Sequence, residues 1–425
     1  MSYFVDEYWM SDGSGMTRCD RQGCAYRAYV PDPLMGRDFV LAGDVAADIA
    51  DAEAAVLRLN SQASSLVSTE TIARVLLRTE AVASSKIEGL HANARRVLRV
   101  EAARDFDVAG RRDVTAEEVL GNVDAMSEAL AAAEVEETIT VDTILRIHAA
   151  PLANTPLQVH RGTVRLEQNW VGGSDHNPCS AAFVPPPPAL VPGLLADLAE
   201  FCSTDSLPAV AQAAIAHAQF ETIHPFIDGN GRAGRALIHL ILRRRGIAPH
   251  VVPPISLILA TLATDYVAGL TAFRYVGEPE SSEAADGLNR WVALFAGCCT
   301  RAVSDAMIYE ERISEIQRRW RDTVGTVRRN STLDLLLETL PGTPVITVTG
   351  AARMLGRSFK AASGAVDELV RAGVLEQVNV GRRNRAFEAP DVLDAFTDLE
   401  RRLASPTGDT RVTPPARRVP TRRRG

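Results

Sequence analysis

The sequence lacks the features that would mark a secreted or membrane protein. Residues 1–10 contain Asp6 and Glu7 and have no apolar core, so no signal peptide opens the chain. We find no apolar run of membrane-spanning length and no internal repeat. Aromatic residues make up only 5% of the chain, and lysine is rare. We therefore expect a cytoplasmic protein that has no membrane partner.

The six cysteines form no complete metal motif. Cys19 and Cys24 could begin a zinc site, but no second pair of cysteines lies near them in the sequence. Thiols stay reduced in the cytosol. We therefore expect free thiols and no zinc.

The chain has a net negative charge, but positive charge is concentrated at the C-terminal end. The net charge of −7 gives the whole molecule no general attraction for nucleic acid. Residues 403–425, by contrast, are rich in proline and carry six arginines against one acid, Asp409. This composition predicts a disordered basic tail, for which we expect no partner.

Hydrophobic periodicity divides the rest of the chain into segments. The 425 residues, 46% of them hydrophobic, suffice for two or three domains. The pattern is irregular over 1–40, where we expect an N-terminal arm, and mostly helical from there to 329. The predicted segments are a helical region at 41–136, a helical core at 137–300, a polar helical connector at 301–329 and a further domain at 330–395.

Residues 224–235 form the motif that carries chemistry, and they are predicted to be a loop that enters a helix. Pro225 disfavours helix at His224, whereas Gly229 and Gly231 permit a tight turn with exposed N–H groups. A helix that begins after such a turn offers an anion site. Arg232 and Arg235 share one face of its first turn and suit a polyphosphate, Asp228 is a hard ligand suited to Mg²⁺, and His224 is a base near neutral pH.

These twelve residues resemble the signature of the Fic family at every fixed position. The resemblance implies a mostly α-helical Fic fold, with the catalytic core at 137–300, and transfer of AMP from ATP to a Ser, Thr or Tyr hydroxyl of a protein. It implies that His224 is the general base and that Phe226 anchors the loop. It further implies that Asp228 holds Mg²⁺, that Gly229, Asn230 and Gly231 surround the α- and β-phosphates, and that Arg232 and Arg235 bind the β- and γ-phosphates.

Two further segments resemble parts of the same family. A predicted flap precedes four prolines and, by resemblance, would hold the target segment by strand addition; it comprises Asn169, Trp170, Val171, Gly172 and Gly173. Ser84, Glu88 and Gly89 resemble the inhibitory motif, in which the glutamate pairs with the second arginine, here Arg235. Such a carboxylate would compete with the γ-phosphate for one guanidinium. One position departs from the family pattern, because Tyr266-Val267 stands where a tyrosine pair often occurs.

Residues 330–395 have the pattern of a winged helix-turn-helix. We expect helices at 333–340, 351–355 and 359–372 and a strand pair at 374–380 and 385–388 around a basic tip that contains Arg382, Arg383 and Arg385. A helix could enter the major groove, yet Asp367 and Glu368 lie on the helix that would read the bases. DNA binding, target recognition and self-association as a homodimer stay open.

The sequence thus favours an autoinhibited protein adenylyltransferase that uses ATP and Mg²⁺ and acts on a protein, which could be itself. One alternative is the reverse reaction, in which Glu88 would position a water that removes AMP. Transfer of another phosphate-linked group is a weaker alternative. A transcription regulator that only senses nucleotide is a fourth, although such a protein would not need His224.

Overall fold

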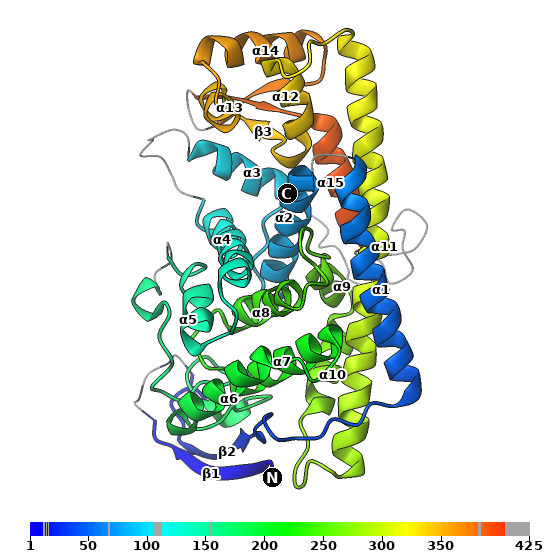
Figure 1. Ribbon diagram of the computed structural model, residues 1–425. Helices are drawn as coiled ribbons and strands as arrows, with labels where there is room; N and C mark the ends of the chain where they lie inside the picture. The colour runs from blue at the N-terminus through cyan, green and yellow to red at the C-terminus, as the bar shows by residue number, and fades with distance from the viewer. Residues whose placement is uncertain are drawn as a thin grey trace. The chain divides into compact units, whose positions relative to one another are not determined.

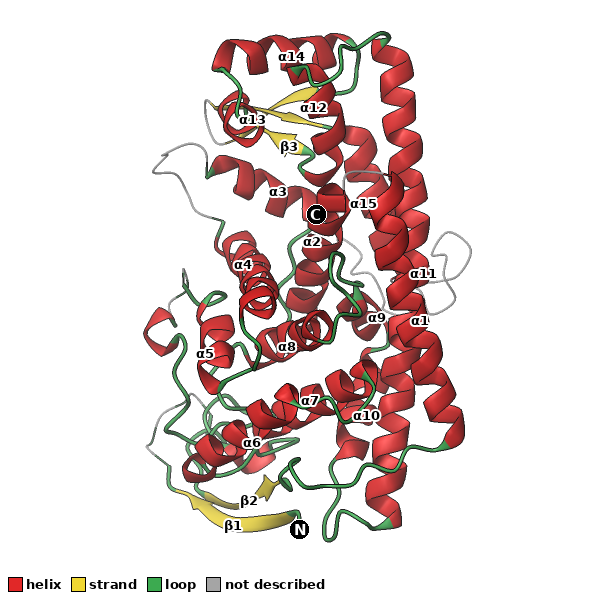
Figure 2. Ribbon diagram, viewed as in Figure 1, coloured by secondary structure: helices red, strands yellow, loops and turns green. Residues whose placement is uncertain are grey.

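The computed structural model describes the chain except residues 12, 14, 16, 67–68, 105–112, 154, 156, 381–383 and 404–425. For residues 62–66, 380, 384, 400 and 402–403 it describes the backbone alone. Helices predominate and two small sheets accompany them, as Figure 2 shows, so the predicted mostly α class is confirmed. The predicted basic tail at 403–425, apart from Leu403, and the tip residues Arg382 and Arg383 lie outside the described residues.

The chain forms two compact units, neither of which is continuous in sequence. Unit 1 comprises Met1–Glu53, Ala125–Gly246 and Thr264–Gly297, and unit 2 comprises Ala54–Asp124, Ile247–Ala263 and Cys298–Gly425. Three of the five boundaries between them fall well inside helices, namely α1 (Gly43–Leu66), α4 (Val114–Val135) and α11 (Ser282–Val324). The segment boundaries predicted from the sequence stay predictions.

Unit 1 is organised around α7, every residue of which is buried. Its sequence is apolar on all sides and rich in alanine, as expected for a helix that is enclosed by others. Trp291 of α11 is fully buried, and its indole Nε1 donates to the carbonyl oxygen of Ala214 in α7 at 2.7 Å. Figure 1 shows α7 beside α8, with which it makes extensive contact. The helices of this unit include α5 (Val141–Ala149), α6 (Val191–Ser203), α7 (Ala209–Ile223), α8 (Asn230–Arg244) and most of α10 (Ala263–Phe273).

The expectation of an irregular arm over residues 1–40 was wrong. Strands β1 (Tyr3–Trp9) and β2 (Cys24–Val30) pair as an antiparallel hairpin. Near the end of β2, the N–H of Tyr29 donates to the carbonyl oxygen of Val184 at 2.9 Å, and Val184 comes just before the proline run. Most side chains of β1 are exposed, so the strand lacks the alternation of apolar and polar residues that would have revealed it.

The expectation of free thiols was wrong for one pair of cysteines. Cys24 of β2 forms a disulfide with Cys179, which lies in the short helix η2 (Pro178–Ser180). The remaining cysteines, Cys19, Cys202, Cys298 and Cys299, are free. The disulfide ties the N-terminal hairpin to the segment that follows the predicted flap.

Unit 2 contains the helix with the predicted inhibitory motif and the predicted winged-helix segment. The carboxylate of Glu80 in α2 is buried and accepts from the N–H of Ser256 at 2.8 Å, at the start of α9. The sheet order is β3-β5-β4. The elements are α2 (Thr69–Ile87), α3 (Ala94–Ala103), α9 (Ile255–Thr261), α12 (Thr332–Thr339), η4 (Leu340–Gly342), β3 (Val345–Ile346), α13 (Val348–Leu355), α14 (Phe359–Arg371), β4 (Glu376–Val380), β5 (Asn384–Glu388) and α15 (Pro390–Leu403).

The 330–395 segment has the helices and paired strands that its sequence predicted, and it adds β3 and α15. These elements share an apolar core with α3. Leu98 and Ala102 of α3 form one buried cluster with Val345, Ala386 and Leu393. The segment is therefore packed onto the N-terminal helices of its own unit.

Helix α11 differs from the prediction in two respects. It runs without a break for 43 residues, so the predicted boundary between core and connector at 300–301 falls inside one helix. It also contains an 18-residue window whose length and apolarity would suffice to cross a membrane, and half of that window is buried inside the protein. Trp291 and Phe295 are among its fully buried residues, which is typical of a core helix.

Candidate active site

The loop between α7 and α8 begins with a strained residue, His224. Its φ of 48° and ψ of 61° are left-handed, a conformation that non-glycine residues seldom adopt. The following Pro225 disfavours a right-handed helical conformation at this position. The N–H of His224 still donates to the carbonyl oxygen of Phe220 at 2.9 Å, so the histidine is the residue at which α7 ends. Strain of this kind persists only where the surroundings fix it.

Two side chains supply that fixation by donating to the backbone of the loop. The guanidinium Nε of Arg165 donates to the carbonyl oxygen of His224 at 2.9 Å, and the amide of Asn169 donates to the same oxygen at 3.1 Å. Asn169 also donates to the carbonyl oxygen of Phe226 at 2.8 Å. Arg165 is almost completely buried, and burial lowers its pKa to about 10. The arginine therefore acts as a structural donor inside the protein.

His148 of α5 holds the middle of the same loop. Its Nδ1 accepts from the N–H of Gly162 at 3.1 Å, so the proton of the neutral ring must lie on Nε2. Nε2 then donates to the carbonyl oxygen of Asp228 at 2.9 Å. The ring stacks on Phe226 with 3.6 Å between centroids, and burial lowers the pKa of His148 to about 4. The imidazole is thus neutral near pH 7.

Asn230, the first residue of α8, uses its side chain on the loop itself. Its Oδ1 accepts from the N–H of Phe226 at 2.9 Å, and its Nδ2 donates to the carbonyl oxygen of Phe226 at 2.8 Å. The amide is therefore occupied by the backbone. Only the backbone N–H of Asn230 is left to contribute to the anion site predicted from the sequence.

The N-terminus of α8 has the properties of an anion site. Its N-cap is Gly229, with a φ of 76° and no capping side chain, so no side chain occupies the N–H groups of the first turn. Arg232 is 4% exposed, and its Nε and Nη1 have no hydrogen-bond partner among the described residues. Arg235 is completely buried one turn further along. Buried guanidinium nitrogens beside an uncapped helix N-terminus attract phosphate oxygens.

The metal prediction rests on a single carboxylate. The Asp228 side chain is half exposed, and its Oδ2 lies 3.4 Å from Nη2 of Arg232. No group of three or more His, Cys, Asp or Glu side chains with the arrangement of a metal site occurs among the described residues. Mg²⁺ is commonly held by one or two carboxylates together with substrate phosphates, so this donor fits that mode of binding.

His224 has a neighbouring carboxylate. Its Nδ1 lies 3.9 Å from Oε2 of Glu221, one turn earlier in α7, and the two side chains are 20% and 11% exposed. A carboxylate at this distance can orient the imidazole ring. His224 is thus partly enclosed, at the start of the loop that leads to α8.

The predicted flap is short. Val171 forms an isolated antiparallel bridge with Phe183, and Gly172 and Gly173 follow it with φ values of 75° and 81°. The Trp170 ring meets Trp9 of β1 edge to face at 5.2 Å, so the N-terminal hairpin supports the flap. Binding of a target segment at these residues stays a prediction, and for Asn169 the structure shows a direct role in holding the catalytic loop.

The predicted inhibitory motif lies at the end of α2. The helix ends at Ile87, and Gly89 has a φ of 81°. The N–H of Leu90 donates to the carbonyl oxygen of Ser85 at 3.0 Å, which closes the helix with a glycine C-cap. Ser84 is buried and Glu88 is exposed. The pairing of Glu88 with Arg235 stays a prediction.

Sequence reasoning missed the roles of His148 and Arg165. A lone histidine on an amphipathic helix gives no signal of its partner 80 residues away. Tyr266 is nearly buried, and its hydroxyl lies 2.8 Å from Nε2 of His217. The residue that departs from the family pattern is the next one, Val267, which is 60% exposed.

Comparison with known proteins agrees with this geometry. Residues 138–242 match the profile of the Fic/DOC family, and residues 46–131 match that of its N-terminal region. The chain is 36% identical over 118 residues to protein adenylyltransferase fic-1 of Caenorhabditis briggsae, an alignment that covers 27% of this chain and 21% of the relative. It is 34% identical over 139 residues to protein adenylyltransferase Fic of Drosophila willistoni, which covers 32% and 26%. The matched region thus spans about a quarter of the relatives' length.

A solved structure supports the fold over most of the chain. The crystal structure of a Fic family protein from Desulfovibrio desulfuricans matches with a TM-score of 0.50 at 18% identity, covering 83% of this chain and 97% of that one. The profiles, the relatives and the loop at the start of α8 agree. Residues 138–242 thus form a region that matches the Fic/DOC family, and residues 46–131 form one that matches its N-terminal region.

Proposed function

We propose that this chain transfers AMP from ATP to a hydroxyl side chain of a protein. The observation that carries the proposal is the buried guanidinium of Arg232, whose Nε and Nη1 lack partners among the described residues, beside the uncapped N-terminus of α8. This arrangement suits the phosphates of a nucleotide. The names of the relatives specify the group that is transferred.

The proposed reaction gives each residue of the loop a role. His224 takes the proton of the acceptor hydroxyl, and the hydroxyl oxygen attacks the α-phosphorus of ATP. The bond from the α-phosphorus to the bridging oxygen breaks, and pyrophosphate leaves. The N–H groups of Asn230 and Gly231 face the charge that develops on the phosphate, and Arg232 and Arg235 hold the β- and γ-phosphates. Mg²⁺, held by Asp228, would neutralise phosphate charge when bound.

Glu88 is proposed as the inhibitor in cis. Its carboxylate would pair with Arg235 and so exclude the γ-phosphate, which leaves the α-phosphate turned away from in-line attack. The protein substrate, the cytoplasmic location and self-modification belong to the proposal as well.

The test is intact-mass and label analysis after incubation with ATP and Mg²⁺. We expect the protein, or a protein of a cell lysate, to gain one AMP. ATP labelled at the α-phosphate should transfer its label, whereas ATP labelled at the γ-phosphate should not. Transfer of the γ label would show phosphorylation and contradict the proposal. Removal of AMP from a modified protein, lost in Glu88→Gly, would favour the reverse reaction.

A further inference from the structure

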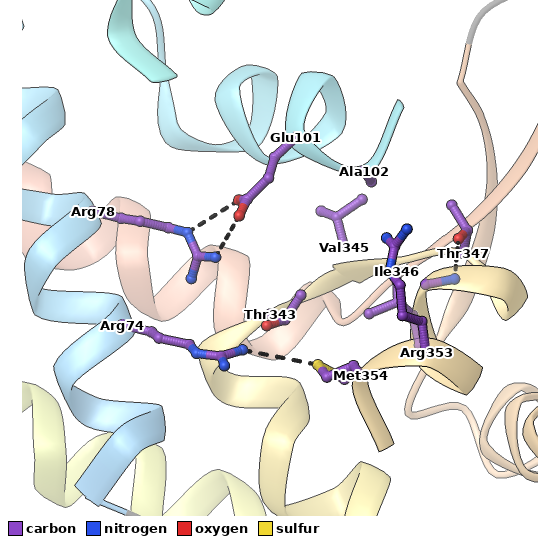
Figure 3. A pocket seen from close by; sticks show the side chains of 11 residues that line it. Arg74, Arg78, Glu101, Ala102, Thr343, Val345, Ile346, Thr347, Arg353 and Met354 are labelled. Carbon is purple, nitrogen blue, oxygen red and sulfur yellow. Dashed lines mark hydrogen bonds and ion pairs between the residues drawn. The ribbon is translucent and has the colours of Figure 1, made fainter. Parts of the chain in front are cut away.

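A basic cavity lies within unit 2, whereas the loop that carries His224 belongs to unit 1. Its volume is about 200 Å³, and its walls come from α2, α3, α13 and the segment between η4 and α13. Figure 3 shows Arg74 and Arg78 extending from α2 on one side and Arg353 from α13 on another. Glu101 is the sole acid among the described residues that line it, so three arginines face one carboxylate.

Arg78 belongs to the framework of the cavity. Its Nε and Nη2 donate to the two carboxylate oxygens of Glu101 at 3.1 and 2.7 Å. Its Nη1 donates to the carbonyl oxygen of Gly342. All three nitrogens therefore have protein acceptors. The bidentate pair with Arg78 neutralises Glu101. No other carboxylate among the described residues that line the cavity can neutralise Arg74.

Arg74 faces the cavity with a poor acceptor. On its exposed side it pairs with Glu70, whose side chain is 73% exposed. On its other side Nη1 lies 3.9 Å from the thioether sulfur of Met354, a weak acceptor. Arg74 can therefore donate to an anion, which is a stronger acceptor than the thioether, without breaking a buried ion pair. Arg74 is thus available to an anion.

Two further features of the wall favour an anion. The hydroxyl of Thr343 is buried and has no hydrogen-bond partner among the described residues. Thr347 and Gly350 place the N-terminal turn of α13 at the cavity, where the helix carries partial positive charge. The N–H of Gly350 donates to Oγ1 of Thr347 at 2.8 Å, so this turn attracts an anion through its charge and not through that N–H group. Arginine, hydroxyl and helix N-terminus together make up the usual donor set for phosphate.

From this arrangement we propose that the cavity between α2 and α13 binds a small phosphate-bearing ligand. Pockets for drug-sized ligands hold about 300–1,000 Å³. A volume of about 200 Å³ corresponds to roughly six or seven waters at about 30 Å³ each. It admits a phosphate group with a short carbon chain. The ligand is accordingly free phosphate or a small phosphate monoester rather than a nucleotide.

The position of the site suggests what the ligand controls, and this part rests on the proposed function. Arg74 and Arg78 lie on α2, the helix that carries Ser84 and ends at Ile87 beside Glu88. Ile87 is nine residues beyond Arg78, or about 14 Å along a helix. A phosphate that joins α2 to α13 restrains the helix bearing the inhibitory motif, so its binding should lower AMP transfer.

The test uses the full chain and calorimetric titration with inorganic phosphate and, separately, with glycerol phosphate, each against chloride at equal ionic strength. We expect binding of phosphate that weakens about tenfold or more in Arg74→Gln and in Arg353→Gln. Arg312→Gln, which removes an exposed cation of the same unit, should bind like the wild type. Thermal unfolding without phosphate checks that each variant is folded. If glycerol phosphate binds and inorganic phosphate does not, the ligand is a phosphate monoester.

The anion site at α8 also attracts phosphate, so ATP titrations accompany the experiment. In Arg74→Gln, ATP binding should be unchanged while phosphate binding is weakened. If Arg74→Gln binds phosphate like the wild type, or if Arg232→Ala alone abolishes phosphate binding, the proposed site is wrong. Phosphate should slow AMP transfer more in the wild type than in Arg74→Gln. If phosphate binds as expected but slows AMP transfer equally in the wild type and in Arg74→Gln, only the regulatory part of the proposal is wrong. If the wild type transfers no AMP even without phosphate, the proposed function is contradicted.

Discussion

The Nε2 atom of His148 lies 2.9 Å from the carbonyl oxygen of Asp228, and the same imidazole stacks on Phe226 at 3.6 Å. One neutral side chain from α5 thus fixes both the anchor of the loop and the backbone of its predicted metal ligand. Gly229 packs against this ring as well, because a Cβ there would lie 3.4 Å from two atoms of His148. The loop is held by its neighbours before any nucleotide binds.

His148→Ala should therefore slow AMP transfer, although His148 is far from His224 in the sequence. Loss of a buried hydrogen bond costs about 0.5–1.5 kcal/mol, and loss of the stacked ring adds to it, so a decrease of about tenfold in kcat is expected. His148→Asn can still donate to Asp228 and should recover part of the rate. Equal rates for His148→Ala and the wild type would show that the loop keeps its geometry without this contact.

His224→Ala should abolish transfer and leave ATP affinity nearly unchanged, because the phosphate contacts lie on α8. General bases contribute about 10²–10⁴-fold to a rate. Calorimetry with ATP and a transfer assay on the same protein measure the two effects. The matched control is His91→Ala, an exposed histidine of unit 2. Transfer at the wild-type rate by His224→Ala would refute the assignment of the base.

Glu88→Gly should raise transfer about tenfold to a hundredfold. A hydrogen bond to a charged group contributes about 1.5–3 kcal/mol, and removal of the carboxylate frees Arg235 for the γ-phosphate. Arg235→Ala should not activate, since it removes the phosphate contact as well, and the double variant should resemble Arg235→Ala. If Glu88→Gly is no faster while His224 is required, residues 84–89 are only the end of a helix.

Stability should fall in acid through His217, which is completely buried. Burial, and then the charge of Arg235, lower the pKa of His217 from 6.5 to about 3. Since the unfolded chain then binds more protons below pH 6.5, the free energy of unfolding is undiminished above that pH and falls as the pH drops toward 3. Chemical denaturation across this pH range should show that the free energy of unfolding declines less steeply for His217→Gln than for the wild type. The control is His176→Gln, at an exposed site, which should follow the wild type.

A chain that ends at Arg328 should unfold at a lower temperature than the full chain. It lacks Val345, Ala386 and Leu393, so Leu98 and Ala102 lose their cover. Exposure of one leucine alone costs about 1.5–3 kcal/mol. ATP binding should persist, because unit 1 contains no residue beyond Gly297. The control is a chain that ends at Leu403, and unfolding of both chains at one temperature would contradict the packing described here.

The sequence predicted best the parts whose geometry is local. The turn at Gly229, the end of α7 at His224 and the start of α8 follow from glycine, proline and spacing within twelve residues. The helices of the 330–395 segment follow likewise from periodicity and capping. These features depend on neighbours in the chain, which a single sequence displays directly.

What the sequence did not predict depends on contacts between distant segments. His148 meets Asp228 across 80 residues, and Cys24 meets Cys179 across 155. Strand β1 is exposed on both faces, so no alternation marks it, and α11 continues as a helix where its composition turns polar. Periodicity reports which face of an element is buried but not which partner buries it.

The discontinuous units also bear on how the protein is synthesised. Every residue of unit 1 has been made once translation reaches Gly297, whereas α3 of unit 2 waits for Val345, Ala386 and Leu393 to complete its core. At about 5–20 residues per second the ribosome needs several seconds for that interval. The candidate catalytic unit can therefore fold on the ribosome before the unit with the inhibitory motif is complete.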